Sequence, residues 1–248
     1  MSSWLWLFLL GIVGVVGIGY GLTRQALGTQ AANRNVVYAV PWLIAGAALP
    51  LILSPLGRYA LVALYAVYAI GVLIWLGSWP LRKRQAGELL IRVGTTLQNR
   101  ILFGFGLLQV GIAIAMTFNQ LDLFTGGLVT TGGILSGIAK LAFWWTLALL
   151  FISIGQSNFE LHEHGLTYLF SWQPWERIAA FGWDDDQPTT LILKAKPRTF
   201  ISRKYLTLSI PSAQIEKVDR LLENYLLETD LAAEMDTDPD DPADRVGA

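Results

Sequence analysis

Hydrophobic positions along residues 4–154 form long runs with almost no charge inside them. A bilayer core about 30 Å thick is crossed by roughly 20 apolar residues in a helix, and each run is close to that length. Pro41 and Pro50 interrupt the second run, but membrane helices tolerate proline. The fifth run is clear from Leu141 onward, and we place its start near Ile134. The pattern predicts five transmembrane helices, at about residues 4–22, 36–53, 59–79, 101–118 and 134–154.

After Ile154 the hydrophobic period changes to the period of two that is typical of half-buried strands. The clearest alternation runs from Leu166 to Trp172 and predicts one face made of Leu166, Tyr168, Phe170 and Trp172. Pro174 ends that strand. The predicted strands are Phe159–Gly165, Leu166–Trp172, Ile178–Trp183, Thr189–Lys196 and a fifth through Tyr205, Thr207 and Ser209.

A helix is predicted after Pro211, with Ser212 as its N-cap. Its apolar positions recur at spacings of three and four, which indicates one buried face. The fold class is therefore an α-helical membrane bundle, residues 1–156, followed by a small α+β domain, residues 157–228. That domain is expected to be an antiparallel five-stranded sheet or partial barrel with a C-terminal helix. Residues 229–248 form an acidic tail, too polar to bury a core, and are expected to be disordered.

Composition and charge agree with a lipid environment. The chain is 53% hydrophobic and 15% charged, whereas soluble domains carry about 25% charged residues. Lys and Arg gather in the loops after the first and third runs, and basic loops stay on the cytoplasmic side. We therefore expect the amino terminus outside and the C-terminal domain in the cytoplasm, in a plasma or thylakoid membrane. A signal peptide is a weaker alternative for the first run, which opens uncharged and aromatic as MSSWLW.

The basic loop from Arg82 to Arg100 allows two interpretations. Its apolar residues, Leu89, Leu90, Ile91 and Val93, suit a short interfacial helix lying against anionic lipid. A plain solvated loop that only sets the topology suits the same residues equally well.

Catalytic and metal-binding chemistry is sparse in the sequence. There is no cysteine, which excludes disulfides and thiol-ligated metals. His162 and His164 would share a strand face with Glu160 beside them, but zinc takes three or four ligands, so a solvated strand end is the preferred interpretation. Asp184–Asp186 favours a turn, and the acidic run after Met235 lacks the glycine and glutamate of a calcium loop. We expect no catalytic set, no metal and no cofactor.

Aromatic and basic residues supply the candidate binding surface. Trp172 and Trp175 are either core residues of a small sheet or an exposed partner-binding surface, and the first interpretation is preferred. A basic group would attract anionic lipid at about 1 kcal/mol per residue, or it is an ordinary solvated hairpin. That group consists of Lys194, Lys196, Arg198, Arg203 and Lys204.

Several short segments carry a family resemblance. They are Gly165-Leu166, Trp175-Glu176-Arg177-Ile178, Leu191-Ile192-Leu193, Ile210-Pro211 and the helix with Ile215, Val218, Asp219, Leu221 and Leu222. The region resembles the bacterial pleckstrin-homology-like domains that follow membrane helices. The whole chain is similar to an uncharacterised family of multi-spanning cyanobacterial membrane proteins. The resemblance covers roughly a quarter of the chain and implies no catalytic residues.

These observations predict a non-enzymatic membrane anchor or scaffold. Its cytoplasmic domain would bind a protein partner, either membrane-embedded or peripheral, or lipid headgroups, and we expect no nucleic-acid partner. Small-residue spacing at Gly17–Gly21 and Gly133–Gly137 is compatible with oligomers. The alternative is a small uncoupled transporter or channel subunit, with its path along the Pro41/Pro50 helix and Gly126–Gly137.

Overall fold

The computed structural model describes residues 57–125, 130–184, 187–196 and 205–228, with scattered positions between 13 and 55. Apart from those scattered positions, the predicted helices at 4–22 and 36–53 lie outside the described residues, as does the acidic tail. The chain divides into two compact units. The first contains residues 47–95 and 99–172, and the second contains residues 1–46, 96–98 and 173–248.

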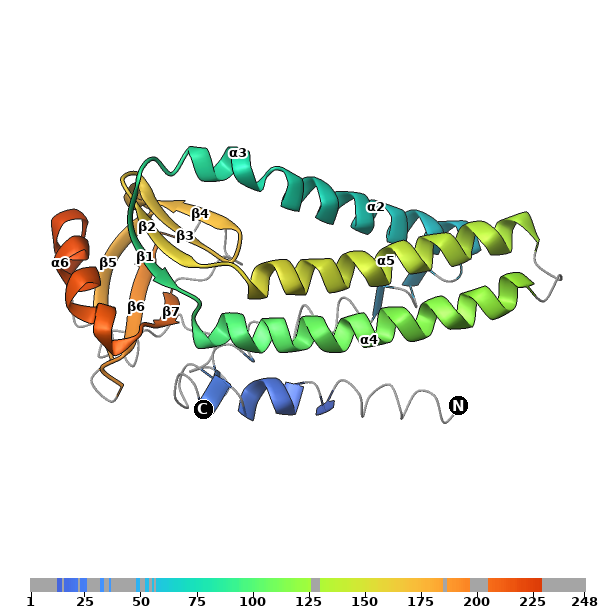
Figure 1. Cartoon of the computed structure of the whole chain (residues 1–248), viewed down its shortest axis with the longest axis horizontal. Helices are drawn as coiled ribbons and strands as arrows, with labels where there is room; N and C mark the ends of the chain where they lie inside the picture. Colours follow the sequence, from blue (N-terminus) through green and yellow to red (C-terminus); the bar gives the residue numbers. More distant parts are fainter. Residues whose placement is uncertain are drawn as a thin grey trace. The chain divides into compact units, whose positions relative to one another are not determined.

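Three long helices dominate the first unit, and all three were predicted. They are α2 (Arg58–Gly77), α4 (Leu97–Thr125) and α5 (Thr131–Gly155), with the short α3 (Trp79–Arg84) following α2 directly. They run alongside one another in Figure 1. The stretches Tyr59–Arg84, Leu97–Thr125 and Thr131–Gly155 are each long and apolar enough to cross a membrane. The α4 helix extends beyond the predicted 101–118 at both ends.

Small residues bring α4 and α5 together. A Cβ atom on Gly155 would lie 2.5 Å from the backbone nitrogen of Phe103. A Cβ atom on Gly106 would lie 2.8 Å from the backbone nitrogen of Ile152. Glycine at these positions lets two backbones approach closely, as is common between membrane helices. Gly137, part of the small-residue spacing noted in the sequence, packs against Phe124 of α4, and the oligomer stays a prediction.

The first antiparallel sheet has the strand order β1-β2-β3-β4. Its strands are β1 (Leu89–Gly94), β2 (Phe159–His162), β3 (Gly165–Tyr168) and β4 (Ser171–Pro174). β1 corrects the interpretation of the loop after the third run, because Leu89–Gly94 is neither an interfacial helix nor a plain loop. It pairs with β2, which is some 70 residues away in sequence, as in the pair Arg92 and Glu160.

The predicted strand Leu166–Trp172 is wrong, because a tight turn divides it into β3 and β4. Leu169 and Phe170 have φ angles of 49° and 57°. Two residues with positive φ between antiparallel strands form the hairpin turn that normally uses Asn or Gly. Leu and Phe carry no such signal, so the alternation appeared continuous. The same turn places Pro174 inside β4 rather than after the strand.

The second unit holds another sheet and a helix. Its strand order is β7-β6-β5-β8. The strands are β5 (Ile178–Trp183), β6 (Thr190–Ala195), β7 (Tyr205–Ser209) and β8 (Leu227–Glu228), and the two-residue β8 runs parallel to β5. The described residues thus form two four-stranded sheets rather than the predicted single five-stranded one.

The C-terminal helix α6 (Ile215–Tyr225) was predicted, but its N-cap was not. Ser212 belongs to a short 3-10 helix, Ser212–Gln214 (η3), and Gln214 is the residue that precedes α6. Val218 and Leu222 are fully buried, as the spacing of apolar residues predicts. The indole Nε1 of Trp183 in β5 donates a hydrogen bond of 2.7 Å to Asp219 of α6. Helix and sheet therefore form one packed unit.

Candidate functional site

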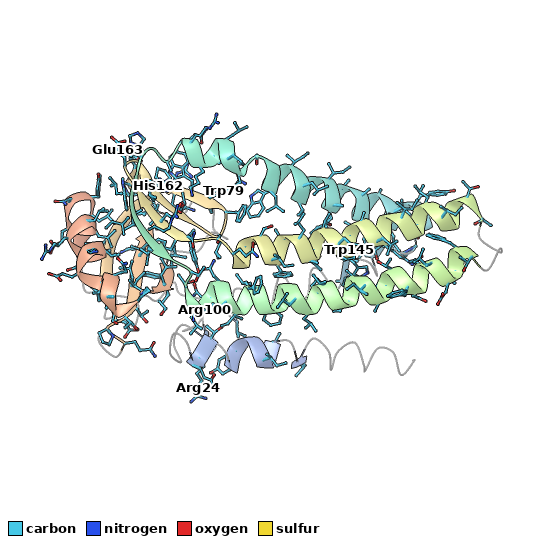
Figure 2. All side chains as sticks on the ribbon, in the orientation of Figure 1. Arg24, Trp79, Arg100, Trp145, His162 and Glu163 are labelled. Carbon is cyan, nitrogen blue, oxygen red and sulfur yellow. The ribbon has the colours of Figure 1, made fainter. Side chains whose placement is uncertain are left out.

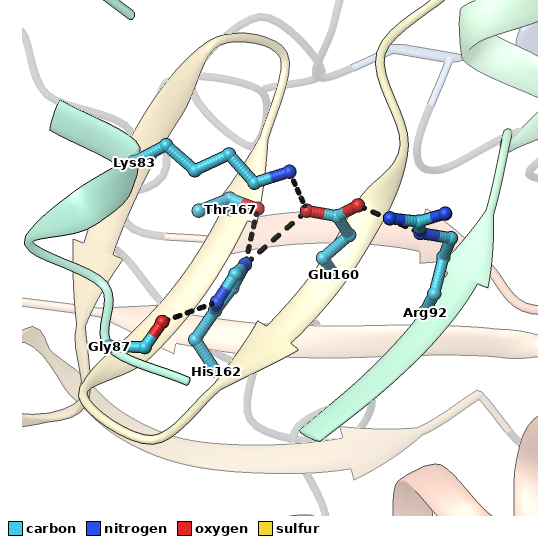
Figure 3. Close-up of polar contacts among 6 residues, drawn as sticks. All are labelled: Lys83, Gly87, Arg92, Glu160, His162 and Thr167. Carbon is cyan, nitrogen blue, oxygen red and sulfur yellow. Dashed lines mark hydrogen bonds and ion pairs between the residues drawn. The ribbon is translucent and has the colours of Figure 1, made fainter. Parts of the chain in front are cut away.

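A polar cluster lies across the first sheet where three strands meet. Arg92 of β1 and Thr167 of β3 are the direct partners of Glu160 in β2. Side chains two apart on a strand share a face, so His162 lies beside Glu160. Figure 3 shows these four side chains together with Lys83, which reaches the cluster from α3. Pairing of distant strands, rather than sequence proximity, assembles this group.

Glu160 is the centre of the cluster. Its side chain is only 3% exposed and accepts hydrogen bonds from Lys83 at Oε2 and from Arg92 Nε at Oε1, the latter at 3.1 Å. Burial by itself raises the pKa of Glu160. The hydrogen bond and charge of Lys83, the hydrogen bond of His162 and the charge of Arg92 outweigh burial, so the pKa lies below its usual value. Glu160 is therefore a buried carboxylate held in its charged form.

His162 is buried, which corrects the interpretation of this segment as a solvated strand end. Its Nδ1 lies 3.2 Å from the carbonyl oxygen of Gly87, and its Nε2 lies 3.3 Å from Glu160 Oε2. A neutral ring has one N–H and donates to one of these acceptors, whereas a charged ring donates to both. His164 is instead exposed in the turn after β2, beside Glu163. Among the described residues, no group of three His, Cys, Asp or Glu side chains could hold a metal ion.

Gly87 lies against the turn between β2 and β3, where a larger residue would not fit. Its φ is +82°, and a Cβ atom there would lie 2.9 Å from the ring of His164. Glycine adopts positive φ without strain, and its missing side chain leaves space for the β2–β3 turn. In this conformation the carbonyl oxygen of Gly87 lies within hydrogen-bond distance of His162 Nδ1.

An aromatic and cationic patch adjoins the cluster at the end of the α2–α3 stretch. The ring of Phe170 lies 5.7 Å from Trp75 and 5.1 Å from Trp79, centroid to centroid. The Arg82 guanidinium lies over both indoles and donates a 3.1 Å hydrogen bond to the Phe170 carbonyl. Figure 2 shows Trp79 toward the same end of the helices as His162, with Trp145 farther along α5. These contacts fix the strained turn between β3 and β4.

A cleft of about 320 Å³ opens between this patch and the cluster. Its lining residues are Trp79, Lys83, Ser153, Gln156, Ser157, Asn158, Glu160 and Phe170. They come from α3, the last turn of α5, the three residues that join α5 to β2, β2 itself and the β3–β4 turn. Ser157 is fixed by Asn99, whose amide nitrogen donates to its hydroxyl and carbonyl oxygens at 2.9 and 2.8 Å. The arrangement is suited to binding a polar group.

The candidate site residues from the sequence are not gathered in this cleft. Trp175 is buried and stacks on Tyr225 with centroids 4.8 Å apart, which favours the core interpretation. Trp172 is half-buried in β4. Lys194 is half-buried near the end of β6, and Lys196, just after that strand, is exposed. Arg198, Arg203 and Lys204 lie outside the described residues, so the basic group as a whole stays a prediction.

Comparisons with known proteins identify one domain. Residues 157–227 match DUF5673, a domain of unknown function. The match begins just before β2 and ends in β8, so it includes Glu160, His162 and Thr167. No curated protein and no solved structure matches the chain. The DUF5673 match locates a domain without giving it an activity.

Sequence reasoning missed Glu160 as the centre of a cluster. The one local signal is the alternation Phe159-Glu160-Leu161-His162, in which two polar residues share a strand face between apolar neighbours. Nothing near them in sequence points to Arg92 or Lys83. Those partners become visible only once β1 is recognised as a strand and paired with β2.

Proposed function

We propose that the chain is a multi-pass membrane protein that acts as a non-enzymatic anchor or scaffold. Its amino terminus lies outside, and its β-rich domain faces the cytoplasm from the plasma or thylakoid membrane. The observation that supports the proposal is the set of three long apolar helices, each long and apolar enough to cross a membrane. Basic residues around α3 favour the cytoplasmic side for that end.

The β-rich domain is proposed to be of the pleckstrin-homology-like kind found in multi-spanning cyanobacterial membrane proteins. Support comes from antiparallel strands arranged in two sheets and followed by an amphipathic helix. We propose that this domain binds a protein partner through the basic group at Lys194 and Lys196. Such an electrostatic contact weakens as salt screens it.

The test uses the full chain in its native membrane. A reporter fused after Ala248 is expected to read as cytoplasmic. A photo-reactive residue at the exposed Lys196 is expected to cross-link one reproducible protein, and the yield should fall in high salt. The matched control places the same photo-reactive residue at Phe118, an exposed apolar position of α4, where lipid adducts are expected. An extracytoplasmic reporter, or only lipid adducts at Lys196, would contradict the proposal.

A further inference from the structure

The cleft beside Lys83 offers hydrogen-bond donors to a ligand. Glu160 lines the cleft, but its two oxygens already accept from Lys83, Arg92 and His162. An ammonium group has three N–H donors, and Lys83 uses one of them on Glu160. The side chains of Ser153, Gln156 and Asn158 also line the cleft, and they make no hydrogen bond to any described residue. The groups left over suit an acceptor-rich ligand.

The charges around the cleft also favour a ligand that is rich in hydrogen-bond acceptors. Lys83 and Arg92 bring two positive charges against one negative charge on Glu160, which leaves one net positive charge. Arg82 adds another cation next to Phe170. Its Nε atom is buried and lacks a hydrogen-bond partner among the described residues. The cleft is therefore built for an anion with several oxygen acceptors, and a phosphate ester has this chemistry.

An apolar groove lies along the same two helices. It is lined by Val67, Tyr68, Gly71, Val72 and Trp75 of α2 and by Leu150 and Ile154 of α5. With a helical rise of 1.5 Å per residue, the segment from Val67 to Trp75 is about 12 Å long. Trp75 lies one turn before Trp79 of the cleft, and Ile154 follows Ser153. A polar cleft at the end of a candidate span is thus followed, within one helical turn along the chain, by an apolar groove on that span.

Backbone strain provides another indication at the same place. Phe170 has a φ of 57°, which bulky residues rarely adopt. Strain of this kind persists where the surrounding structure enforces it, and it concentrates at ligand-binding sites. Here the turn brings the Phe170 ring to Trp79 at the wall of the cleft.

We propose that this cleft binds the phosphate group of an anionic membrane phospholipid while one acyl chain lies in the groove. The groove distinguishes a lipid from a soluble phosphate ester, because a soluble ester would leave it unused. The inference rests on the membrane placement in the proposed function and identifies one of its ligands. It assigns lipid binding to residues of α3 and of the chain around the end of α5, and not to the basic group at Lys194.

The first test titrates dioleoyl phosphatidylglycerol into the delipidated full chain in detergent, with bound lipid counted by native mass spectrometry. The wild-type chain is expected to hold one lipid tightly. Lys83→Ala should weaken that binding about tenfold, since a charge-assisted hydrogen bond is lost. Arg84→Ala removes the same charge from the same helix at an exposed position that does not line the cleft, and it should change affinity little. Equal losses in the two variants would overturn the proposal.

Two further variants leave the Lys83–Glu160 pair intact, so a folding defect in Lys83→Ala would not hide the result. Gln156→Leu removes an amide donor and should weaken binding severalfold. Gly71→Leu fills the groove, where a Cβ atom meets nothing within 4 Å, and should also weaken it. Gly111→Leu on α4, equally unobstructed, is its control. Gly111→Leu is expected to bind as the wild type does. If Gly71→Leu also binds as the wild type does, the groove holds no acyl chain and the proposal is wrong.

Glycerol 3-phosphate supplies the same phosphate without acyl chains. At equal concentration it is expected to leave the lipid in place. If it binds as tightly as phosphatidylglycerol, the ligand is a soluble phosphate ester and the lipid assignment fails. None of these failures would change the reporter or cross-linking result, so failure of the cleft and failure of the scaffold role can be told apart.

Discussion

Similar apolar side chains are exposed on the candidate membrane spans and buried in the strands. Ile70, Leu108 and Phe118 on the helices are 56%, 62% and 66% exposed. Leu161, Leu166 and Phe181 on the strands are completely buried. Exposed apolar residues on this scale are unfavourable in water and ordinary in lipid. The difference is compatible with helices that cross a membrane and strands that fold around a core of their own.

The polar residues show the reverse arrangement. On the long helices the polar residues Gln109, Gln120 and Thr146 are buried, as is common in helices that cross a membrane. In the first sheet a charged residue, Glu160, is buried and paired with cations. Close helix contacts therefore hold one region together, and a buried ionic cluster helps to hold the other.

The largest expected effect comes from breaking the close helix contact. Gly155→Ala places a methyl group against the Phe103 backbone, which cannot rotate away as a side chain could. We expect a loss of about 3 kcal/mol in the free energy of unfolding, the upper end of the range for overpacking. Thermal unfolding of the full chain in detergent measures it. Gly104→Ala, where a Cβ atom meets nothing within 4 Å, is the control, and equal midpoints for both variants would contradict the contact.

The next effect breaks the ionic cluster. Glu160→Gln leaves Lys83 and Arg92 without their carboxylate, at an expected cost of about 2 kcal/mol. The cost stays below that of a fully buried pair because these cations are 38% and 60% exposed. Glu163→Gln, a neighbouring and exposed carboxylate, should change the free energy of unfolding little. Urea titration of both variants measures the two free energies of unfolding. Similar losses would show that the ion pairs of Glu160 do not stabilise the fold more than an exposed carboxylate does.

The lowered pKa of Glu160 predicts that the stability of the folded chain depends on pH. Because the pKa of Glu160 is lower in the folded state, its stabilisation is complete above the ordinary value of 4.5. It is lost as the pH falls through the lower, folded-state pKa. Unfolding of the wild-type chain should therefore become easier on acidification, and Glu160→Gln should show a shallower dependence. Thermal midpoints at a series of pH values measure both slopes, and parallel curves would exclude Glu160 as a source.

The smallest effects lie in the second unit, where a single polar contact between β5 and α6 and another within α6 can each be removed by one substitution. Trp183→Phe removes the 2.7 Å hydrogen bond to Asp219 and should cost about 1 kcal/mol. Glu216→Gln breaks only the exposed pair with Arg220 on α6 and should cost about 0.3 kcal/mol. Denaturant unfolding followed by tryptophan fluorescence ranks the two, and a larger loss for Glu216→Gln would reverse the expected order.

Local patterns predicted a large part of the described fold. Hydrophobic periodicity predicts the spans over α2, α4 and α5, most strands of the β-rich region and the buried face of α6. It does so because periodicity records which side of each element is buried. The failures have local causes as well. Leu169 and Phe170 form a turn without turn residues, and β1 resembled a basic loop because charged residues flank it.

The sequence alone located the apolar segments that are long enough to cross a membrane and the segments that alternate as strands, since hydrophobic runs and charges are properties of single segments. Only the tertiary structure decided that β1 pairs with β2, and hence that Arg92, Glu160 and Lys83 meet. Strand pairing joins residues that are distant along the chain, and its hydrogen bonds are made by the backbone, which every residue shares. The residues of the cleft therefore become neighbours through folding, and no local pattern records them.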